Sequence, residues 1–333
     1  MRKFFSVLFL FQILLLGCSS KENNQNEIIV YTAMEENLID EYIKEFNKEY
    51  PDIKLSVISS GTGDILAKLI AEKGNPQADV IWALSDLMIL DDYKLLEPYT
   101  PKGIENVNEI FKDKNKKWFG ISAWMIAIGV NTEELKKLKI DKIDSYFSLL
   151  LPQLKEQVLM ANPASSGTGY LTVNTFINLF GEVEAWKYMD ELHKNISNYT
   201  SSGNAPVQII ARGEKIVGFI PAYQGLKIKK EDKFPLEVIF PKEGLGWELE
   251  GNALVNKKNI KDGSKIFLDW TLSEKGMLLH SKNRGFVTIE KYRKIEGYPS
   301  NTESYLKQRD FKKELINREE ILKKWEKRYG KGE

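Results

Sequence analysis

The chain has very little of the chemistry that most enzymes and metalloproteins use. Its 333 residues include one cysteine, Cys18, and two histidines, His193 and His280. A single cysteine cannot form an internal disulfide, and neither histidine has a second histidine or a cysteine at metal-ligand spacing. No G-x-S-x-G, P-loop or H-E-x-x-H motif occurs. The sequence therefore predicts a protein that is not an enzyme and that has no cofactor.

The chain also lacks an excess of charge of either sign. Lys and Arg number 48 and Asp and Glu number 47, which gives a formal net charge of +1. Nucleic acid is drawn to a net positive field, so this balance argues against nucleic acid as a partner. After the first 17 residues, no apolar run approaches the length of a membrane span.

The amino-terminal segment has the pattern of a bacterial lipoprotein signal. Arg2-Lys3 precede an apolar run that ends at Leu16, and Gly17-Cys18 follow. In such signals the chain is cut before the cysteine, which is then lipidated. We therefore predict a signal peptide at 1–17 and a polar, lipidated tether at 18–27. The mature chain should be exported and held to a membrane through Cys18, on the periplasmic or cell-surface side.

The first part of the chain alternates apolar strands with amphipathic helices. Strands are predicted at 27–32, 54–58 and 78–83, with helices at 34–50 and 64–72 between them. This alternation indicates a parallel sheet covered on both faces. Ligands bind such sheets where the strands end at their carboxyl side. The strand exits contribute small, hydroxyl or acidic candidate residues: Thr32, Ala33, Glu35 and Asp86.

One pentapeptide, SSGTG, occurs twice about a hundred residues apart. Ser59-Ser60-Gly61-Thr62-Gly63 and Ser165-Ser166-Gly167-Thr168-Gly169 each stand between a predicted strand and a predicted helix. The start of a helix offers unpaired N–H groups and a positive dipole end, and glycine lets an anion come close to the backbone. Two ordinary helix caps are the alternative. We interpret the pair as two facing anion-binding turns, with these ligand-binding candidates: Ser60, Gly61, Thr62, Ser165, Ser166, Gly167 and Thr168.

The rest of the chain repeats the α/β pattern and adds two segments that could cross between lobes. An extended apolar segment at 118–131 contains Trp124, and a return crossing is predicted at 238–248. A hydroxyl-rich turn at 199–206 contributes Ser202, and the strand at 216–223 ends on Tyr223. Helices are predicted at 170–180, 181–196, 207–212, 263–272 and 304–329.

Several stretches resemble one family of transport proteins. The stretches VYTAMEENLIDEYIKEF, KLIAEKGNPQADVIWAL, ANPASSGTGYL, NYTSSG and FPKEGLGWELEG are similar to solute-binding lipoproteins of ABC importers. The most similar group is the 2-aminoethylphosphonate-binding one, within the ferric-iron-binding type of periplasmic proteins. The resemblance implies an α/β, two-lobed periplasmic-binding-protein type II fold, each lobe a mainly parallel sheet flanked by helices, with two strand crossings.

The resemblance also implies lobe boundaries and partners. Lobe 1 would span 28–122 and be completed by 249–300, and lobe 2 would span 123–248 and be completed by 301–333. The protein would be a monomer that closes over a small anionic or zwitterionic ligand and delivers it to an inner-membrane ABC permease.

The nature of the ligand separates two readings of the resemblance. Ferric-binding relatives hold iron with two adjacent tyrosines after a Gly-Glu turn, whereas only Tyr223 follows Gly213-Glu214 here. If iron is nevertheless the ligand, Tyr223 and Glu35 would supply oxygens. A phosphonate or organophosphate suits the hydroxyl-rich turns better, and 2-aminoethylphosphonate is the best guess. Its ammonium end would need a carboxylate or an aromatic face, for which the candidates are Glu35, Asp86, Trp82, Trp124 and Tyr223.

A different class of function is an exported serine hydrolase. Ser165 or Ser166 would then be the nucleophile. Such a serine needs a general base, and no residue in the sequence is paired with either serine at a recognisable spacing. The binding-protein interpretation is therefore preferred.

Overall fold

A computed structural model describes residues 26–231, 234–293, 296–300, 302–306, 309 and 311–330. The signal-peptide prediction and Cys18 lie outside these residues, as does nearly all of the tether. Within the described ranges, no helix is both long and apolar enough to cross a membrane.

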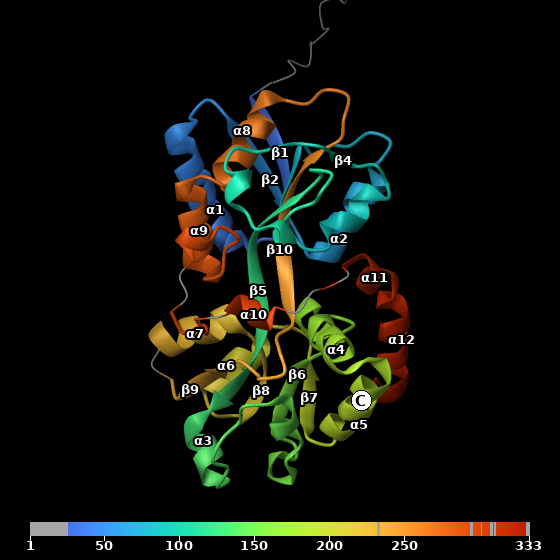
Figure 1. The fold of residues 1–333 in the computed structure, drawn as a ribbon, viewed down its shortest axis with the longest axis vertical. Coiled ribbons are helices and arrows are strands. Elements are labelled where there is room, and N and C mark those ends of the chain that lie inside the picture. The colour runs from blue at the N-terminus through green and yellow to red at the C-terminus, as the bar shows by residue number, and fades with distance from the viewer. Residues whose placement is uncertain are drawn as a thin grey trace, which may run out of the picture.

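The upper half of the molecule in Figure 1 is built from the amino-terminal strand–helix units. Strand β1 (Glu27–Thr32) pairs in parallel with β2 (Lys54–Ser59) and β3 (Val80–Leu84). Helices α1 (Glu36–Glu49) and α2 (Thr62–Ala71) connect these strands. Helix α1 buries Ile39, Tyr42 and Phe46, which recur at helical spacing and therefore form one apolar stripe.

The lower half repeats this arrangement with its own parallel strands. Strand β6 (Val158–Ala161) pairs in parallel with β7 (Ile196–Thr200) and β8 (Val217–Pro221). The covering elements are α3 (Thr132–Lys137), α4 (Gly167–Phe180), α5 (Glu182–His193), α6 (Ala205–Ala211), α7 (Ala222–Glu231) and the edge strand β9 (Leu236–Ile239).

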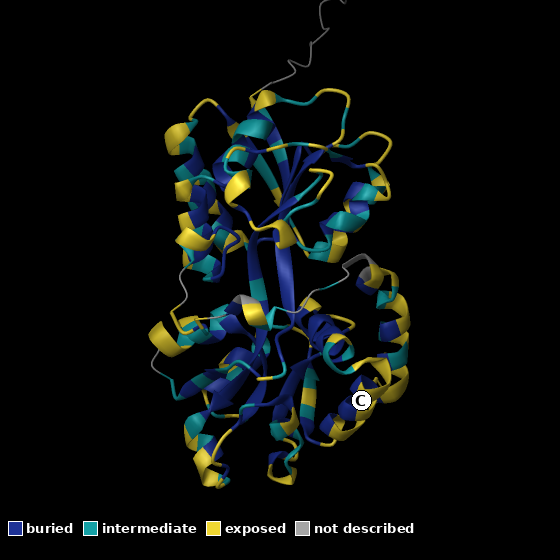
Figure 2. Ribbon diagram, viewed as in Figure 1, coloured by how far each residue is buried: buried dark blue, intermediate teal, exposed yellow. Residues whose placement is uncertain are grey.

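Two long antiparallel strands join the halves. Strands β5 (Phe119–Asn131) and β10 (Trp247–Val255) pair side by side and run between the halves in Figure 1. The sheet order is β2-β1-β3-β10-β5-β8-β6-β7. Both strands are buried along their length except at Trp124, which is half-buried, so their dark blue ribbons stand out in Figure 2.

The carboxyl-terminal elements return to both halves. Helices α8 (Asp262–Thr271) and α9 (Glu274–Arg284) pack on the upper half, and the buried side chains of α12 (Arg318–Tyr329) belong to the core of the lower half. The remaining short elements are β4 (Leu96–Glu97), α10 (Thr302–Tyr305), α11 (Phe311–Ile316), η1 (Leu87–Asp91), η2 (Ile104–Asn106), η3 (Glu109–Phe111), η4 (Tyr146–Leu150), η5 (Pro152–Leu154) and η6 (Glu290–Tyr292).

The structure differs from the predicted elements in three places. The predicted return crossing at 238–248 lies later, at Trp247–Val255, because a turn with positive φ at Gly244 separates it from β9. The single helix predicted at 304–329 is divided into α10, α11 and α12. Helix α9 was not predicted, since its apolar residues do not form a clear stripe.

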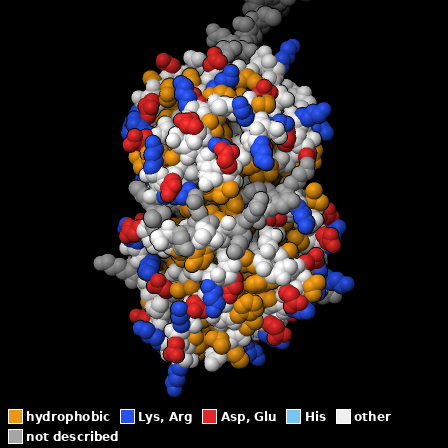
Figure 3. Space-filling view, viewed as in Figure 1, with side chains coloured by type: hydrophobic (Ala, Val, Ile, Leu, Met, Phe, Trp, Pro, Cys, Tyr) orange, Lys and Arg blue, Asp and Glu red, His pale blue; other side chains and the backbone are white. Residues whose placement is uncertain are grey.

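Acidic and basic side chains are mixed over the surface. On the face in Figure 3 they alternate, and no broad region of one sign is visible there. This agrees with the formal net charge of +1. This face therefore has no concentration of positive side chains that would attract a polyanion.

Candidate functional site

A polar cavity of about 170 Å³ lies where the two halves meet. Residues from the upper half, the crossing strands and the lower half all line it. They are Ala33, Glu35, Thr62, Ala83, Ser85, Trp124, Thr168, Asn204, Pro221, Tyr223, Glu250 and Arg284. We call this cavity the cleft.

The two SSGTG turns bring two helix starts to the cleft. Helix α2 begins at Thr62 and α4 begins at Gly167, and Thr62 and Thr168 both line the cavity. Ser166 is the N-cap of α4, and the backbone N–H of Gly169 donates to its Oγ at 3.3 Å. The first turn of a helix leaves N–H groups without an intrahelical acceptor. Both positive helix ends therefore serve one cavity.

Of the residues predicted from the sequence to bind ligand, six line the cleft. They are Ala33, Glu35, Thr62, Trp124, Thr168 and Tyr223. These six come from four different strand exits or helix starts and from the crossing strand β5. The rule that ligands gather at the carboxyl ends of parallel strands thus predicts a real convergence of side chains.

Other predicted residues lie beside the cleft with their hydroxyls engaged elsewhere. Ser60 donates to Asp64 at 2.9 Å, and Ser165 donates to the carbonyl of Ser201 at 3.0 Å. The Thr32 hydroxyl is fully buried and accepts from the N–H of Met34 at 3.0 Å. Ser202 likewise accepts from the N–H of Asn204. The last residues in this group, Gly61, Ser166 and Gly167, form the two helix starts but are not among the lining residues.

A glycine keeps the second turn in position. Gly203, between β7 and α6, lies so close to the turn that an added Cβ would overlap the Thr168 side chain and approach Ser166 Oγ at 2.8 Å. Gly167, by contrast, has open space around the position of a Cβ. The loop at Ser202–Asn204 therefore packs closely against Thr168 and limits its movement.

Another part of the cleft lining carries charge. The Arg284 guanidinium donates to Glu35 Oε2 at 2.7 Å and, through Nε, to Glu250 Oε1 at 2.9 Å. Burial acts to raise the pKa of Glu35, but the Arg284 charge and its hydrogen bonds hold that pKa below its ordinary value. Glu250 also accepts a short hydrogen bond from Ser122. Two carboxylates share one cation, so this wall has a net charge of about −1.

Tyr223 links the two halves across the cleft. Its hydroxyl donates to Glu35 Oε1 at 3.3 Å, and the Arg284 guanidinium lies 5.0 Å from the centre of its ring. Burial raises the pKa of Tyr223 well above its ordinary value, and the Glu35 charge acts in the same direction. The phenol therefore stays protonated and acts as a hydrogen-bond donor.

Sequence reasoning missed half of the lining. Arg284 ends the unpredicted helix α9, and Glu250 lies on β10, just beyond the return crossing predicted at 238–248. Ser85, Asn204, Ala83 and Pro221 complete the missed set. Asn204 and Ser85 lie in turns that the sequence analysis identified, so their position after a predicted strand could have marked them as ligand-binding candidates. Arg284 had no comparable signal.

Asp86 belongs to a separate charged cluster. Its backbone is left-handed (φ 57°). Burial raises the pKa of its carboxyl, and the charges of Arg309 and Arg318 act to lower that pKa. Glu248 lies in the same cluster, 3.6 Å from Arg309, and within the described residues its Oε1 has no hydrogen-bond partner. Burial raises the pKa of Glu248 to about 8, although the Arg309 charge acts to lower it. The sequence predicts Asp86 in the binding site, but Asp86 is not among the residues that line the cleft.

The Glu248→Gln variant should flatten the pH dependence of stability. The folded-state pKa of Glu248 is about 8, against an ordinary value of 4.5 for a glutamate. Between these values the unfolded chain releases a proton that the folded chain keeps, so stability falls as pH rises through this window. Denaturant unfolding at pH 5.5, 6.5 and 7.5 should show a falling free energy of unfolding in wild type and a smaller slope in the variant. The surface variant Glu319→Gln should keep the wild-type slope; equal slopes in all three proteins would contradict the assignment.

The oxygen donors proposed for iron are already engaged. Tyr223 donates to Glu35, and Glu35 is paired with Arg284. Within the described part of the chain, no group of three His, Cys, Asp or Glu side chains is arranged to hold a metal. The Arg284 guanidinium therefore lies beside Glu35 and Tyr223, where the iron alternative would place the metal ion.

The serine-hydrolase alternative also lacks its base. His193 Nδ1 lies 2.9 Å from the hydroxyl of Tyr199, and His280 is fully buried with Nδ1 3.1 Å from the hydroxyl of Tyr42. Ser165 donates to a backbone carbonyl, and Ser166 caps α4. Neither serine is paired with an imidazole.

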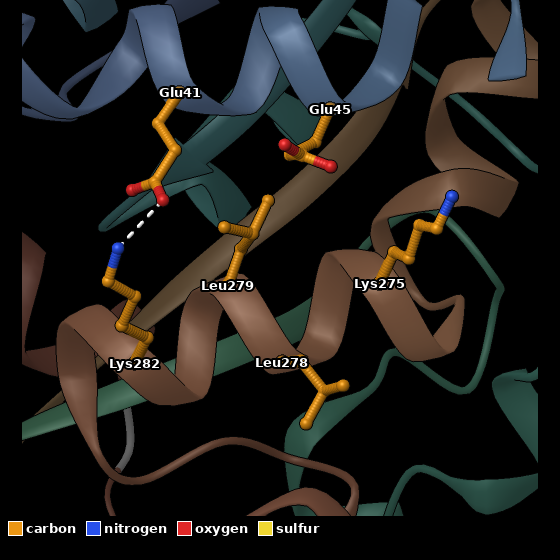
Figure 4. A pocket seen from close by; sticks show the side chains of 6 residues that line it. All are labelled: Glu41, Glu45, Lys275, Leu278, Leu279 and Lys282. Atoms are coloured by element: carbon orange, nitrogen blue, oxygen red, sulfur yellow. Dashed lines mark hydrogen bonds and ion pairs between the residues drawn. The ribbon is translucent and has the colours of Figure 1, made fainter. Parts of the chain in front are cut away.

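A second hollow, of about 270 Å³, lies on the surface between α1 and α9 (Figure 4). Leu278 and Leu279 lie between charged side chains, and Lys282 pairs with Glu41 at 2.7 Å. Its other charged residues are Glu45 and Lys275, which pair with Lys48 and Glu49. No polar groups converge here as they do in the cleft.

Two α/β halves that meet over a polar cleft and are joined by two strands define a ligand-capturing receptor. The chain belongs to the family of bacterial extracellular solute-binding proteins, whose model matches residues 41–293. It is therefore an exported, non-enzymatic solute-binding component of an ABC importer, which binds a small ligand and interacts with a permease.

Relatives of known structure share the whole architecture. The periplasmic binding protein AfuA from Actinobacillus pleuropneumoniae, with exogenous fructose-6-phosphate bound, is 33% identical with a TM-score of 0.79, over 92% of this chain and 99% of that one. Apo ferric ion-binding protein A from Pasteurella haemolytica is 18% identical with a TM-score of 0.75, over 91% and 98% of the two chains. The predicted periplasmic-binding-protein type II fold is confirmed.

Relatives in sequence include proteins with and without an assigned ligand. A Haemophilus influenzae protein described as uncharacterized is 37% identical over 283 residues, 82% of this chain and 81% of that one. An Fe(3+)-binding periplasmic protein from Serratia marcescens is 22% identical over 284 residues, with the same coverage of both chains.

Proposed function

We propose that this protein captures a small phosphonate or organophosphate, with 2-aminoethylphosphonate as the best guess, and passes it to the permease. The two lobes, 28–122 with 249–300 and 123–248 with 301–333, would close over the ligand. The protein would act as a monomer held to the membrane through a lipid on Cys18.

The polarity of the cleft is the observation that carries this proposal. Helices α2 and α4 both begin at the cleft, where Thr62 and Thr168 offer hydroxyls. The Glu35–Arg284–Glu250 group, which lines the same cavity, has a net negative charge. An anionic head at the helix starts and a cationic or hydroxyl-bearing end at Glu35 would match both regions.

The available donors are sufficient for ordinary receptor affinity. Each charge-assisted hydrogen bond contributes about 1.5–3 kcal/mol, and micromolar binding needs roughly 8 kcal/mol. Two threonine hydroxyls and the N–H groups of two helix starts could supply several such bonds. The cost of ordering the ligand reduces the sum, so micromolar affinity is a reasonable expectation.

One relative of known structure, AfuA, supports a phosphorylated ligand, and experiment must identify the other end of the molecule. The fructose-6-phosphate bound to AfuA carries a phosphoryl group and hydroxyls. A hydroxyl could donate to Glu35 in place of an ammonium. The ferric-binding relatives favour iron, but Arg284 beside Glu35 and Tyr223 opposes a trivalent cation there.

Titration calorimetry on the purified full chain tests the proposal. We expect heat from 2-aminoethylphosphonate and weaker binding of ethylphosphonate, which lacks the ammonium. The double variant Thr62→Val/Thr168→Val should weaken binding about 100-fold, because two hydrogen bonds to the anionic head are lost. Fructose-6-phosphate and ferric citrate are the competing ligands.

The Glu35→Gln variant is the matched test of the other end of the ligand. It should weaken 2-aminoethylphosphonate and leave ethylphosphonate nearly unchanged, because only the first places a charge at that wall. Binding of ferric citrate with no binding of any phosphorus compound would refute the proposal.

A further inference from the structure

We infer that Arg284 is a specificity-determining residue: it occupies, as a resident cation, the point where oxygen donors converge, and so excludes metal ions from the cleft. This inference concerns the metal-free character of the site and does not depend on the identity of the phosphorus-containing ligand.

The Arg284 guanidinium makes the contacts with carboxylate oxygens that a bound cation would make. Its Nη1 and Nη2 reach the two carboxylate oxygens of Glu35 at 3.3 and 2.7 Å. Its Nε reaches the two oxygens of Glu250 at 2.9 and 3.0 Å. Tyr223 covers the guanidinium and donates to Glu35. One side chain thus occupies the space bounded by two carboxylates and a phenol.

The donors around it are those that hard cations prefer. Carboxylate and phenol oxygens bind Ca²⁺, lanthanides and Fe³⁺, whose charge needs several oxygens at short range. Here Glu35 and Glu250 point at one centre from different parts of the fold, the end of β1 and strand β10. Without the guanidinium, the same wall would carry two uncompensated negative charges.

Arg284 is well placed to keep a metal out. It is only 5% exposed, it lies at the end of α9, and Tyr298 donates to its backbone carbonyl at 3.2 Å. A metal ion at this point would stand beside a fixed positive charge, and that repulsion is strong where water is largely excluded. The arginine cannot lose its proton to relieve it.

Binding of terbium to the full chain tests the inference, with luminescence sensitised by nearby aromatic rings as the readout. Wild type should give only a weak signal at high Tb³⁺ concentration. Arg284→Ala should reach the same signal at about 100-fold lower Tb³⁺ concentration, since two carboxylates then converge on an empty space. Arg284→Lys, which keeps a cation, should behave like wild type. The triple variant Arg284→Ala/Glu35→Gln/Glu250→Gln should lose the gained signal.

Each outcome decides the inference. A folded Arg284→Ala chain, verified by circular dichroism, that binds Tb³⁺ no better than wild type overturns it. Equal Tb³⁺ binding by the Lys and Ala variants also overturns it, because charge would then not be the cause of exclusion. If Arg284→Ala does not fold alone, refolding with Tb³⁺ should restore it; no recovery overturns the inference. None of these results depends on phosphonate binding, so a failure here is distinct from a failure of the proposed function.

Discussion

Replacing Gly203 with alanine should weaken ligand binding about 100-fold, since one or two charge-assisted hydrogen bonds of the second turn would be lost. The added Cβ would overlap the Thr168 side chain and crowd Ser166 Oγ at 2.8 Å. Thr168 lines the cleft, so it cannot move without changing the site. Overpacking of this kind also costs about 1–3 kcal/mol of stability. Calorimetry measures the first effect, and denaturant unfolding measures the second.

Gly167→Ala is the matched control for this prediction. It lies in the same turn, yet its Cβ would meet no atom within 4 Å. It should therefore keep stability near wild type and leave the Thr168 side chain in its place in the cleft. If Gly203→Ala binds ligand as tightly as Gly167→Ala does, the turn does not hold Thr168 against the ligand.

Trp325→Ala should destabilise the protein by about 3–5 kcal/mol, the usual loss when a large buried aromatic is removed. Trp325 is 1% exposed, and its ring packs edge-on against Tyr199 with the centroids 5.0 Å apart. With Ile321 and Tyr329 it joins α12 to the core of the lower half. The midpoint of urea unfolding should fall accordingly.

A surface change on the same helix provides the comparison. Lys324 pairs with Glu182 at 2.6 Å, and exposed pairs of this kind are worth about 0–1 kcal/mol, so Lys324→Ala should have a small effect. Comparable losses in the two variants would mean that α12 is held by its surface charges. A small loss for Trp325→Ala alone would mean that the lower core does not need the helix.

Local pattern predicted the backbone of the site well. The period of apolar residues and the glycine-rich turns identified β1, β2, β3 and the two helices that follow the turns, although these begin at Thr62 and Gly167, two and three residues before the predicted starts at 64 and 170. These features depend on neighbours in sequence, which is why they can be read from it. The crossing strand β5 was found for the same reason, as a long apolar run.

The direction of each side chain was not predictable in the same way. Ser60 and Ser165 have the same composition around them as Thr62 and Thr168, yet they turn to Asp64 and to the Ser201 carbonyl. Which hydroxyl of a turn faces the cleft depends on the backbone of that turn.

Arg284 shows a second limit. Its role comes from Glu35 and Glu250, which are 249 and 34 residues away in sequence. Nothing in the residues around it indicates a buried ion pair. Glu250 was hidden similarly, because a glutamate on a crossing strand gives no local sign of which cation it will meet.

The interleaving of the chain through its two halves affects the order in which it can fold. Strand β10 lies between β3 and β5 in the sheet, and Trp325 of α12 belongs to the core of the lower half. The sheet therefore cannot be completed until β10 (Trp247–Val255) has been synthesised, and the lower core also needs α12 (Arg318–Tyr329). We expect this dependence on segments far along the chain to slow compaction while the polypeptide is exported, which would favour passage in an unfolded state.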